Sequence, residues 1–443
     1  MIAARLAGAL TALTALCTPA AAAPPDGAPA REQAEGLTTD TWRGPEQPLE
    51  VHWHILAVPE YLVELAFTPL GFVTSVVERY RLDRRIYDLL RNDEGTIQVV
   101  PTGKISGGDG IGVGGAIDIE DLIGRGEDIE VGGLVRLNSD WEASAEYEQS
   151  LATLEGREVH LGLEYELDQN EKFYGAGNDT TPADRRILRE SIFQSMAGID
   201  IFALGTPDYA GLFEVGYRRV RLTPGTDVDV DEIPLGGAGD TVEPPPDFGS
   251  THDYLTAGFA LQYDTRDQTA STSRGLLALV SARTTISPDE TSLGAVTGSA
   301  EVHWYIPVLP RRRVVVLSGG VGASAPLGED REIPFHELVV HDRKNHLRGY
   351  GNDRFRDRLG WWTSAEYRYP IYEYQDTGVG LTTSLFVDAG RVAGEVTEVW
   401  EGPIRWDVGA GVRAETEKFV ILLLEVARSP EGIEVGLTVG KDF

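Results

Sequence analysis

The chain ends with residues 433–443, IEVGLTVGKDF, in which apolar side chains alternate with polar or very small ones. One side of this stretch would carry Ile433, Val435, Leu437, Val439 and Phe443, and the other side Glu434, Gly436, Thr438, Gly440 and Asp442. A period of two residues indicates an extended strand, because successive side chains of a strand point to opposite faces. These residues therefore predict a strand with one apolar face and one face of glycines and charges.

The same alternation recurs from Ile97 onward, for example in DYLTAGFALQYD (253–264), WWTSAEYRYP (361–370) and GLTTSLFVDAG (380–390). A soluble β-sandwich would also alternate. Here, however, the polar faces carry glycines and charges with only small side chains between them, which suits a hydrated lumen. The apolar faces are rich in Leu, Val and aromatic residues, which suits lipid. Because strands in hydrocarbon must pair every backbone group, the sequence predicts an all-β fold, a transmembrane antiparallel β-barrel.

Counting the alternating stretches gives about 16 strands, an even number as in bacterial outer-membrane barrels. They lie near 97–106, 111–121, 128–139, 141–151, 157–168, 188–204, 208–222, 253–264, 275–286, 293–306, 312–325, 361–371, 379–389, 403–414, 419–428 and 433–443. The long connectors, 169–187, 223–252 and 326–360, all follow odd-numbered strands, and the connectors after even-numbered strands are shorter. Long loops at one end and short turns at the other are typical of such barrels.

The composition excludes several classes of protein. The 443 residues carry a formal net charge of −31, so we expect no nucleic-acid partner, because neutralising phosphates requires a basic face. No apolar run approaches the roughly 18 residues of a transmembrane helix. A single cysteine, Cys17, excludes a disulfide-stapled domain. The eight histidines are scattered and no G-x-S-x-G motif is present, so we expect no enzyme, no metal and no cofactor.

The first quarter of the chain differs in composition from the rest. Residues 1–23 have a basic start, a short apolar stretch and an A-x-A site, as in a secretory signal peptide. Residues 24–48 are rich in Pro, Gly and charge and indicate a flexible linker. Residues 49–96 carry apolar residues at helical spacing with arginines among them, which predicts a short periplasmic helical segment. This segment would either bind a membrane or partner surface or pack on its own protein. Residues 97–443 would form the barrel.

Two neighbouring predicted strands place acidic residues in the lumen. If the alternation puts Trp361 toward lipid, then Glu366 and Arg368 face inward on the same strand. By the same argument Phe386 and Asp388 face inward on the next strand. Glu366 and Asp388 would be neighbours across the ladder, and two such carboxylates repel each other unless a cation lies between them.

The longest connector supplies a candidate for that cation. It contains NHLRGYGNDRFRDRLG (345–360), in which the string Leu347-Arg348-Gly349-Tyr350 stands in a polar segment. The planar guanidinium of Arg348 can serve two carboxylates at once. We expect Gly349 to allow a tight turn and Tyr350 to stack on the barrel wall. The alternative is a flexible outer loop with incidental arginines.

Several strings together resemble the BamA/TamA superfamily of outer-membrane barrels, also called the bacterial surface antigen family. Leu347-Arg348-Gly349-Tyr350 is similar to the signature of the family's sixth extracellular loop. The other strings, in chain order, are DLIGRGEDIEVGG (121–133), FYGAGN (173–178), YDTRDQTASTSRG (263–275), AEYRYP (365–370) and FVDAG (386–390), the last ending at Gly390. The resemblance covers about Ile97 to Phe443.

The resemblance implies that the sixth loop folds back into the barrel and that its arginine pairs with acidic residues of the wall. It implies that Phe443 is the C-terminal signal by which the host's barrel-assembly machinery inserts the chain. The family's periplasmic POTRA domains have a β-α-α-β-β order, and residues 24–96 show no such pattern. The chain therefore resembles the branch without POTRA domains.

The expected function follows from this resemblance. A protein of this family would lie in the outer membrane of a Gram-negative bacterium, in contact with its lipid, and would assist insertion or export of outer-membrane proteins or lipids. A weak seam between the first and last strands would allow this, because Pro101 cannot donate to a ladder and the last strand contains Gly436 and Gly440. The alternative is a passive channel or structural surface protein that keeps the barrel and plug without insertase activity.

Overall fold

The computed structural model describes residue 92 and residues 96–439, with gaps at 107–109, 123, 125, 138, 151–157, 202–207, 226–234, 237–239, 290–291, 309–312, 375–378 and 416–419. The proposed signal peptide and linker therefore lie outside the described residues, as do nearly all of the helical segment 49–96 and Phe443. Among the described residues no helix is long and apolar enough to cross a membrane. The helices that are described are short 3-10 turns.

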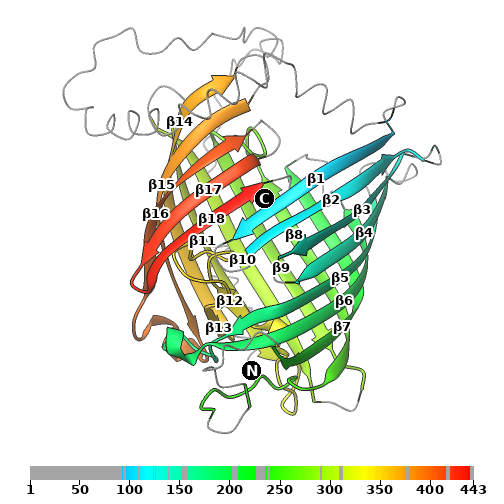
Figure 1. Ribbon diagram of the computed structural model, residues 1–443, viewed down its shortest axis with the longest axis vertical. Coiled ribbons are helices and arrows are strands. Elements are labelled where there is room, and N and C mark those ends of the chain that lie inside the picture. The colour runs from blue at the N-terminus through cyan, green and yellow to red at the C-terminus, as the bar shows by residue number, and fades with distance from the viewer. Residues whose placement is uncertain are drawn as a thin grey trace, which may run out of the picture. The chain divides into compact units, whose positions relative to one another are not determined.

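Sixteen long strands form one antiparallel sheet that curls around a lumen, with each strand hydrogen-bonded to its neighbours (Figure 1). The strands are β1 (Ile97–Ser106), β2 (Gly110–Glu120), β3 (Glu127–Arg136), β4 (Trp141–Ser150), β5 (Glu158–Phe173), β6 (Arg186–Ile201), β7 (Tyr209–Pro224), β8 (Thr251–Asp264), β9 (Gly275–Ile286), β10 (Gly294–Pro307), β11 (Val314–Pro326), β14 (Leu359–Tyr374), β15 (Val379–Ala393), β16 (Arg405–Glu415), β17 (Val420–Ser429) and β18 (Gly432–Val439). This confirms the predicted all-β sheet of sixteen antiparallel strands.

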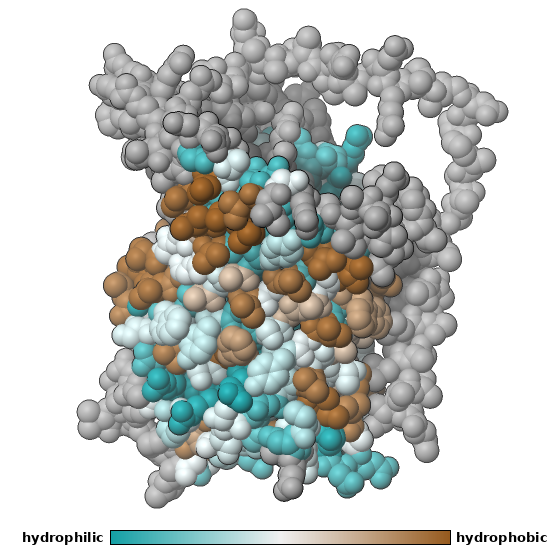
Figure 2. All heavy atoms as spheres, turned by 90° about the vertical axis from the view of Figure 1, so that its right-hand side faces the viewer, coloured by the Kyte–Doolittle hydropathy of each residue, from teal (hydrophilic) through white to brown (hydrophobic). Residues whose placement is uncertain are grey.

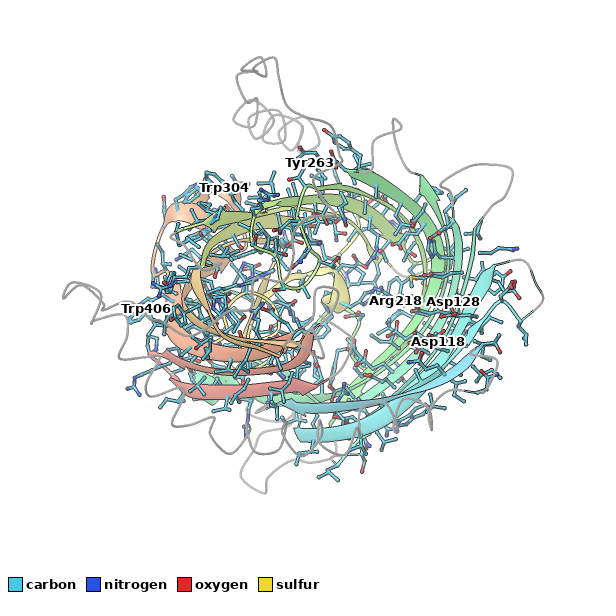
Figure 3. The ribbon with its side chains drawn as sticks, turned by 90° about the horizontal axis from the view of Figure 1, so that it is seen from above. Asp118, Asp128, Arg218, Tyr263, Trp304 and Trp406 are labelled. Atoms are coloured by element: carbon cyan, nitrogen blue, oxygen red, sulfur yellow. The ribbon has the colours of Figure 1, made fainter. Side chains whose placement is uncertain are left out.

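The alternation of the sequence becomes an apolar outside and a polar inside. On the outer face Leu163 is 52% exposed and Leu261 is 53% exposed, whereas the inward Asp388 is only 1% exposed. Figure 2 shows hydrophobic residues gathered over the outer surface of the strands, with hydrophilic residues below them. Seen along the barrel in Figure 3, Trp304 and Trp406 lie on the outside. The exposed apolar residues form the surface that a lipid bilayer would cover.

The two ends of the sheet meet along a short seam. Strand β1 pairs with β2 over ten residues, from Ile97↔Ile119 to Ser106↔Gly110. Within the described residues, which stop at Ser106 on one side and at Val439 on the other, it pairs with β18 over four, from Gly103↔Val439 to Ser106↔Gly436. The described part of the seam therefore has fewer ladder hydrogen bonds than the β1–β2 pair.

The connectors divide the barrel into two ends. At the loop end lie the connectors after β5, β7, β11 and β15, and at the turn end the shorter connectors after β2, β4, β6, β8, β10, β14 and β16. The connector after β5 is shorter than expected, since β5 continues past a bulge at Asp168/Glu171 to Phe173. Polar residues can extend a strand there because its backbone groups still find partners on β6.

The connector between β11 and β14 has its own secondary structure. It contains η4 (Phe335–Glu337) and a hairpin of β12 (Val339–His341) and β13 (Phe355–Asp357). We call residues 327–358 the inner loop, because their apolar side chains pack within the barrel. Phe335 and Leu347 are at most 1% exposed, although the connector is rich in charge. Phe335 joins a buried cluster with Leu188, Leu222 and Tyr254 of the surrounding strands.

Candidate functional site in the barrel lumen

Arg348 of the inner loop contacts three strands of the wall. Its Nε and Nη2 each donate to the Asp388 carboxylate on β15 at 2.8 Å, a bidentate pair. Its Nη1 donates to Glu366 of β14 at 3.3 Å and to Glu425 of β17 at 3.0 Å. Burial alone would lower the pKa of Arg348, but its bonds to Asp388 and the nearby carboxylates outweigh burial and raise that pKa above its ordinary value.

The strand register explains why these groups meet. Asp388 lies directly opposite Ser364, and Glu366 lies opposite Phe386, so the two acids are diagonal neighbours on the inner face. Ser364 Oγ donates to Asp388 at 2.6 Å and accepts from Arg348 Nη2 at 3.2 Å. The strand register thus places both acids on the same face of the sheet, and the Arg348 guanidinium bonds to Glu366 and to Asp388.

Phe386 forms the platform under the guanidinium. The Arg348 Cζ atom lies 3.4 Å from the centre of the Phe386 ring, close enough for a cation–π contact. On the other side of the ring is Gly409 of β16, where an added Cβ would lie 2.3 Å from the ring carbon Cζ. A glycine at this position is required for the ring to lie flat against the wall.

Glu366 is shared by three arginines. Besides Arg348, it accepts from Nε of Arg368 at 3.0 Å and from Nη2 of Arg413 at 3.2 Å. Glu366 is 7% exposed and Arg413 is 8% exposed, so these charges lie away from bulk solvent. Removing one member of such a buried network leaves the others without compensation, which is costly.

The rest of the Leu-Arg-Gly-Tyr string is packed tightly. Leu347 and Tyr350 are buried with Phe355 and Val392. The Tyr350 ring meets the Phe355 ring edge-on at 5.1 Å, and its hydroxyl donates to the Trp406 carbonyl of β16 at 3.3 Å. The Tyr350 ring therefore packs on Phe355 of its own loop, in a cluster that includes Val392 of wall strand β15, and its hydroxyl bonds to β16.

Gly349 has a different role from the one expected. Residues 347–350 do form a tight turn, in which the Tyr350 amide donates to the Leu347 carbonyl at 3.1 Å, but the φ of Gly349 is not left-handed, so this turn does not require a glycine. Instead, an added Cβ would lie 2.5 Å from the Cβ of Asp407 on β16. Gly390 serves similarly, since a Cβ there would lie 3.0 Å from the Trp361 carbonyl oxygen. Both glycines permit close approach of backbone to neighbouring groups.

Further contacts anchor the inner loop and were not anticipated from the sequence. Arg354 makes a bidentate pair with Glu431, in the connector between β17 and β18, at 2.7 and 2.8 Å. On the opposite wall, Glu337 of η4 accepts from Arg218 of β7 at 3.3 Å and from Thr285 of β9 at 2.8 Å. Figure 3 shows Arg218 on the inner side of the ring. The inner loop therefore spans the lumen from β7 and β9 to β14–β17.

Two acids of the site were not predicted from the sequence. Glu425 is the lone acidic residue of the strand VILLLEVARS and stands among apolar residues, and that isolation was the available signal. Asp407 faces Asp388 directly across the β15–β16 ladder and is fully buried. Neither Asp407 oxygen has a hydrogen-bond partner among the described residues. Two buried carboxylates thus lie side by side, but only Asp388 receives Arg348.

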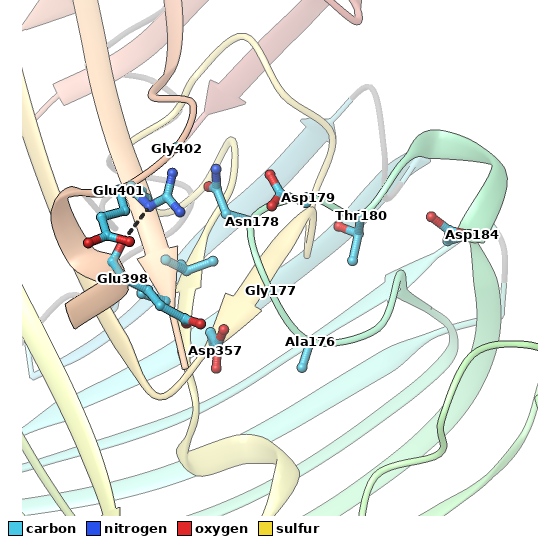
Figure 4. Close-up of a pocket in the computed structure, with 13 residues that line it drawn as sticks. Ala176, Gly177, Asn178, Asp179, Thr180, Asp184, Asp357, Glu398, Glu401 and Gly402 are labelled. Carbon is cyan, nitrogen blue, oxygen red and sulfur yellow. Dashed lines mark hydrogen bonds between the residues drawn. The ribbon is translucent and has the colours of Figure 1, made fainter. Parts of the chain in front are cut away.

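A separate cavity of about 690 Å³ opens at the loop end, between the β5–β6 connector and η5 (Val396–Trp400) (Figure 4). Its lining is mostly polar and includes Asn178, Asp357, Arg391 and Glu401. Asn178 Nδ2 and Arg391 Nη1 both donate to the Pro403 carbonyl at 2.8 Å. The Asn178 bond joins the two connectors that form the cavity, and the Arg391 bond ties the β15–β16 connector to β15.

Comparisons with known proteins bear on the whole barrel. Residues 121–422 match the family described as the Omp85 superfamily domain. BamA from Haemophilus ducreyi lacking POTRA domains 1-3 is 15% identical with a TM-score of 0.58, covering 79% of this chain and 70% of that chain. CdiB from Escherichia coli is 11% identical with a TM-score of 0.51, covering 77% and 62%. CdiB from Acinetobacter baumannii is 10% identical with a TM-score of 0.52, covering 79% and 60%.

The chain thus spans less than two thirds of either CdiB structure. At these low identities the structural likeness establishes the fold. No curated protein matches the chain by sequence.

Proposed function

The chain belongs to the Omp85 superfamily, whose β-barrels lie in the outer membrane of Gram-negative bacteria, and from this membership we propose that it assists insertion or export of proteins or lipids at that membrane. The observation that carries the proposal is the seam between β1 and β18, which pairs over four residues in the described part of the chain. A strand edge with few ladder bonds can separate and offer its free backbone groups to an incoming strand. Opening of this seam toward lipid would be the working step.

The inner loop would act as a fixed strut during that step. Arg348 binds β14, β15 and β17, and Arg354 binds the connector that leads into β18. These contacts support the C-terminal side of the barrel up to the strand that borders the seam. Separation would then take place between β1 and β18 while β14–β17 keep their arrangement.

Locking the seam tests this proposal. Thr438 of β18 lies opposite Lys104 of β1 and opposite Leu423 of β17. A Lys104→Cys/Thr438→Cys variant can therefore close the seam by a disulfide, whereas Leu423→Cys/Thr438→Cys joins two strands on one side of it. Both variants carry Cys17→Ala. We expect oxidation to abolish complementation of a deletion strain by the seam variant, reductant to restore it, and the control to complement under both conditions.

The deletion strain is scored by the proteome of its outer membrane and by the exposure of phospholipid at the cell surface. Loss of particular barrel proteins would identify protein clients, and exposed phospholipid would identify lipid transport. If neither changes on deletion, the protein is a passive channel or a structural surface protein, and the proposed insertion or export role is wrong.

A further inference from the structure

A histidine and three carboxylates converge on the inner wall near the turn end, on other strands than those that Arg348 contacts. They are Glu148 of β4, Glu158 and His160 of β5, and Asp200 of β6. Leu161, the next residue on β5, is 48% exposed on the outer face, so His160 points into the lumen. Opposite His160 on β6 is Gly198, which has no side chain to separate the imidazole from Asp200.

The two ring nitrogens of His160 have different environments. Nδ1 lies 3.0 Å from Glu148 Oε1, directly across the β4–β5 ladder. A carboxylate in this position accepts a hydrogen bond from Nδ1–H, which fixes the tautomer and leaves the Nε2 lone pair for another group. Nε2 is enclosed and lies 3.1 Å from Asp200 Oδ2, within ion-pair distance but outside the angles of a well-directed hydrogen bond. The contact has the length of a hydrogen bond without its direction.

The distance of 3.1 Å between His160 Nε2 and Asp200 Oδ2 fits two ligand atoms of one metal ion. Zinc bonds of about 2.1 Å to nitrogen and oxygen, set between right and tetrahedral angles, place the two ligand atoms roughly 3.0–3.4 Å apart. Glu158, His160 and Asp200 each offer one ligand atom, and these three atoms lie within 4.8 Å of one another. Among the described residues, this is the one group of three His, Cys, Asp or Glu side chains whose potential ligand atoms lie this close together.

We propose that Glu158, His160 and Asp200 bind a divalent transition-metal ion, with Glu148 orienting the imidazole. One imidazole nitrogen and two carboxylate oxygens favour zinc or a similar ion over calcium and magnesium, which select oxygen-only sites. The ion would offset the charge of the clustered carboxylates and join β5 to β6 beside the turn-end connectors. This site is independent of the proposed insertion or export role.

Titration of the purified full-length protein with zinc tests the site. After treatment with chelator and dialysis, the protein in detergent should bind one zinc ion by calorimetry. We expect at least tenfold weaker binding in His160→Gln and in Asp200→Asn. The matched control is Glu146→Gln, another inward acid of β4 that lies opposite Gly162. It should bind zinc as the unchanged protein does, and X-ray absorption of the zinc complex should show imidazole scattering.

Two results would overturn the proposal. One is zinc binding that is absent, or that is equal in His160→Gln and the unchanged protein. The other is calcium competing as well as zinc, which would mean diffuse attraction to acidic side chains. The folding of His160→Gln is checked by circular dichroism and by the difference in electrophoretic mobility between heated and unheated samples. If this variant does not fold, Asp200→Asn and Glu158→Gln decide the question. Zinc should also raise the unfolding temperature of the unchanged protein and leave that of Asp200→Asn where it was.

Discussion

Asp388 and Asp407 stand directly opposite each other, and both are almost completely buried. Only Asp388 accepts the bidentate pair from Arg348. We expect Asp388→Asn to remove about 2–3 kcal/mol from the free energy that keeps the inner loop docked, because hydrogen bonds to charged groups in buried sites have that magnitude. This corresponds to about 30- to 150-fold more frequent opening. Cleavage of residues 327–358 by added protease measures the change.

Asp407→Asn is the matched control. It removes a carboxylate that repels Asp388 and has no hydrogen-bond partner among the described residues. Its cleavage should be as slow as that of the unchanged protein, or slower. Equal acceleration in both variants would mean that any loss of negative charge loosens the loop, and that the Arg348–Asp388 pair has no special role in holding it.

The hairpin in the inner loop brings a histidine against the wall, so its docking should depend on pH. The His346 ring stacks on Trp362 with centres 3.8 Å apart, and burial lowers the pKa of His346 to about 3. In an undocked loop its pKa would be near 6.5. The docked loop therefore excludes a proton that the free loop binds, and the stability from this neutral ring is complete above about pH 6.5. It is lost as the pH falls from there toward about 3.

Protease cleavage of the loop should accordingly be faster at pH 5 than at pH 7.5. His346→Phe keeps an aromatic ring on Trp362 and removes the titration, so its cleavage should vary less with pH. His341 acts in the same direction, since burial lowers its pKa to about 4. Burial raises the pKa of Asp353 and of Asp357, which opposes the effect. The difference between variant and unchanged protein is thus the test, and parallel pH profiles would contradict it.

At the level of the elements, the sequence was informative where one face of a strand had to be apolar. Alternation located all sixteen long strands and placed Glu366 and Asp388 on one inner face. Strand ends were less predictable, since beyond the apolar belt a polar stretch such as 168–172 can pair as well as it can form a loop. The hairpin of β12 and β13 was missed because its register depends on the barrel around it.

The candidate site was predictable only as far as local rules reach. Alternation assigns a residue to the inside of the wall, but the path of the inner loop decides which inward residues it meets. Glu425 lies 77 positions from Arg348 in the sequence, and its contact requires three strands to be laid side by side. The close approach at Gly349 likewise depends on Asp407 of a distant strand.

For the whole molecule, the short seam predicts an uneven stability around the ring. Strands β9 and β10 pair over twelve residues, from Gly294↔Ile286 to Tyr305↔Gly275, whereas β1 and β18 pair over four among the residues that the structure describes. Because local opening is easiest where few hydrogen bonds must break together, backbone amides of β1 and β18 should exchange with deuterated water faster than those of β9 and β10. Mass spectrometry of the protein in lipid nanodiscs can measure this for each strand. Oxidised Lys104→Cys/Thr438→Cys should slow exchange in β1 and β18 and leave β9 and β10 unchanged. Equal protection of all four strands in the unlocked protein would show a firm seam, and lateral opening would then have no structural basis.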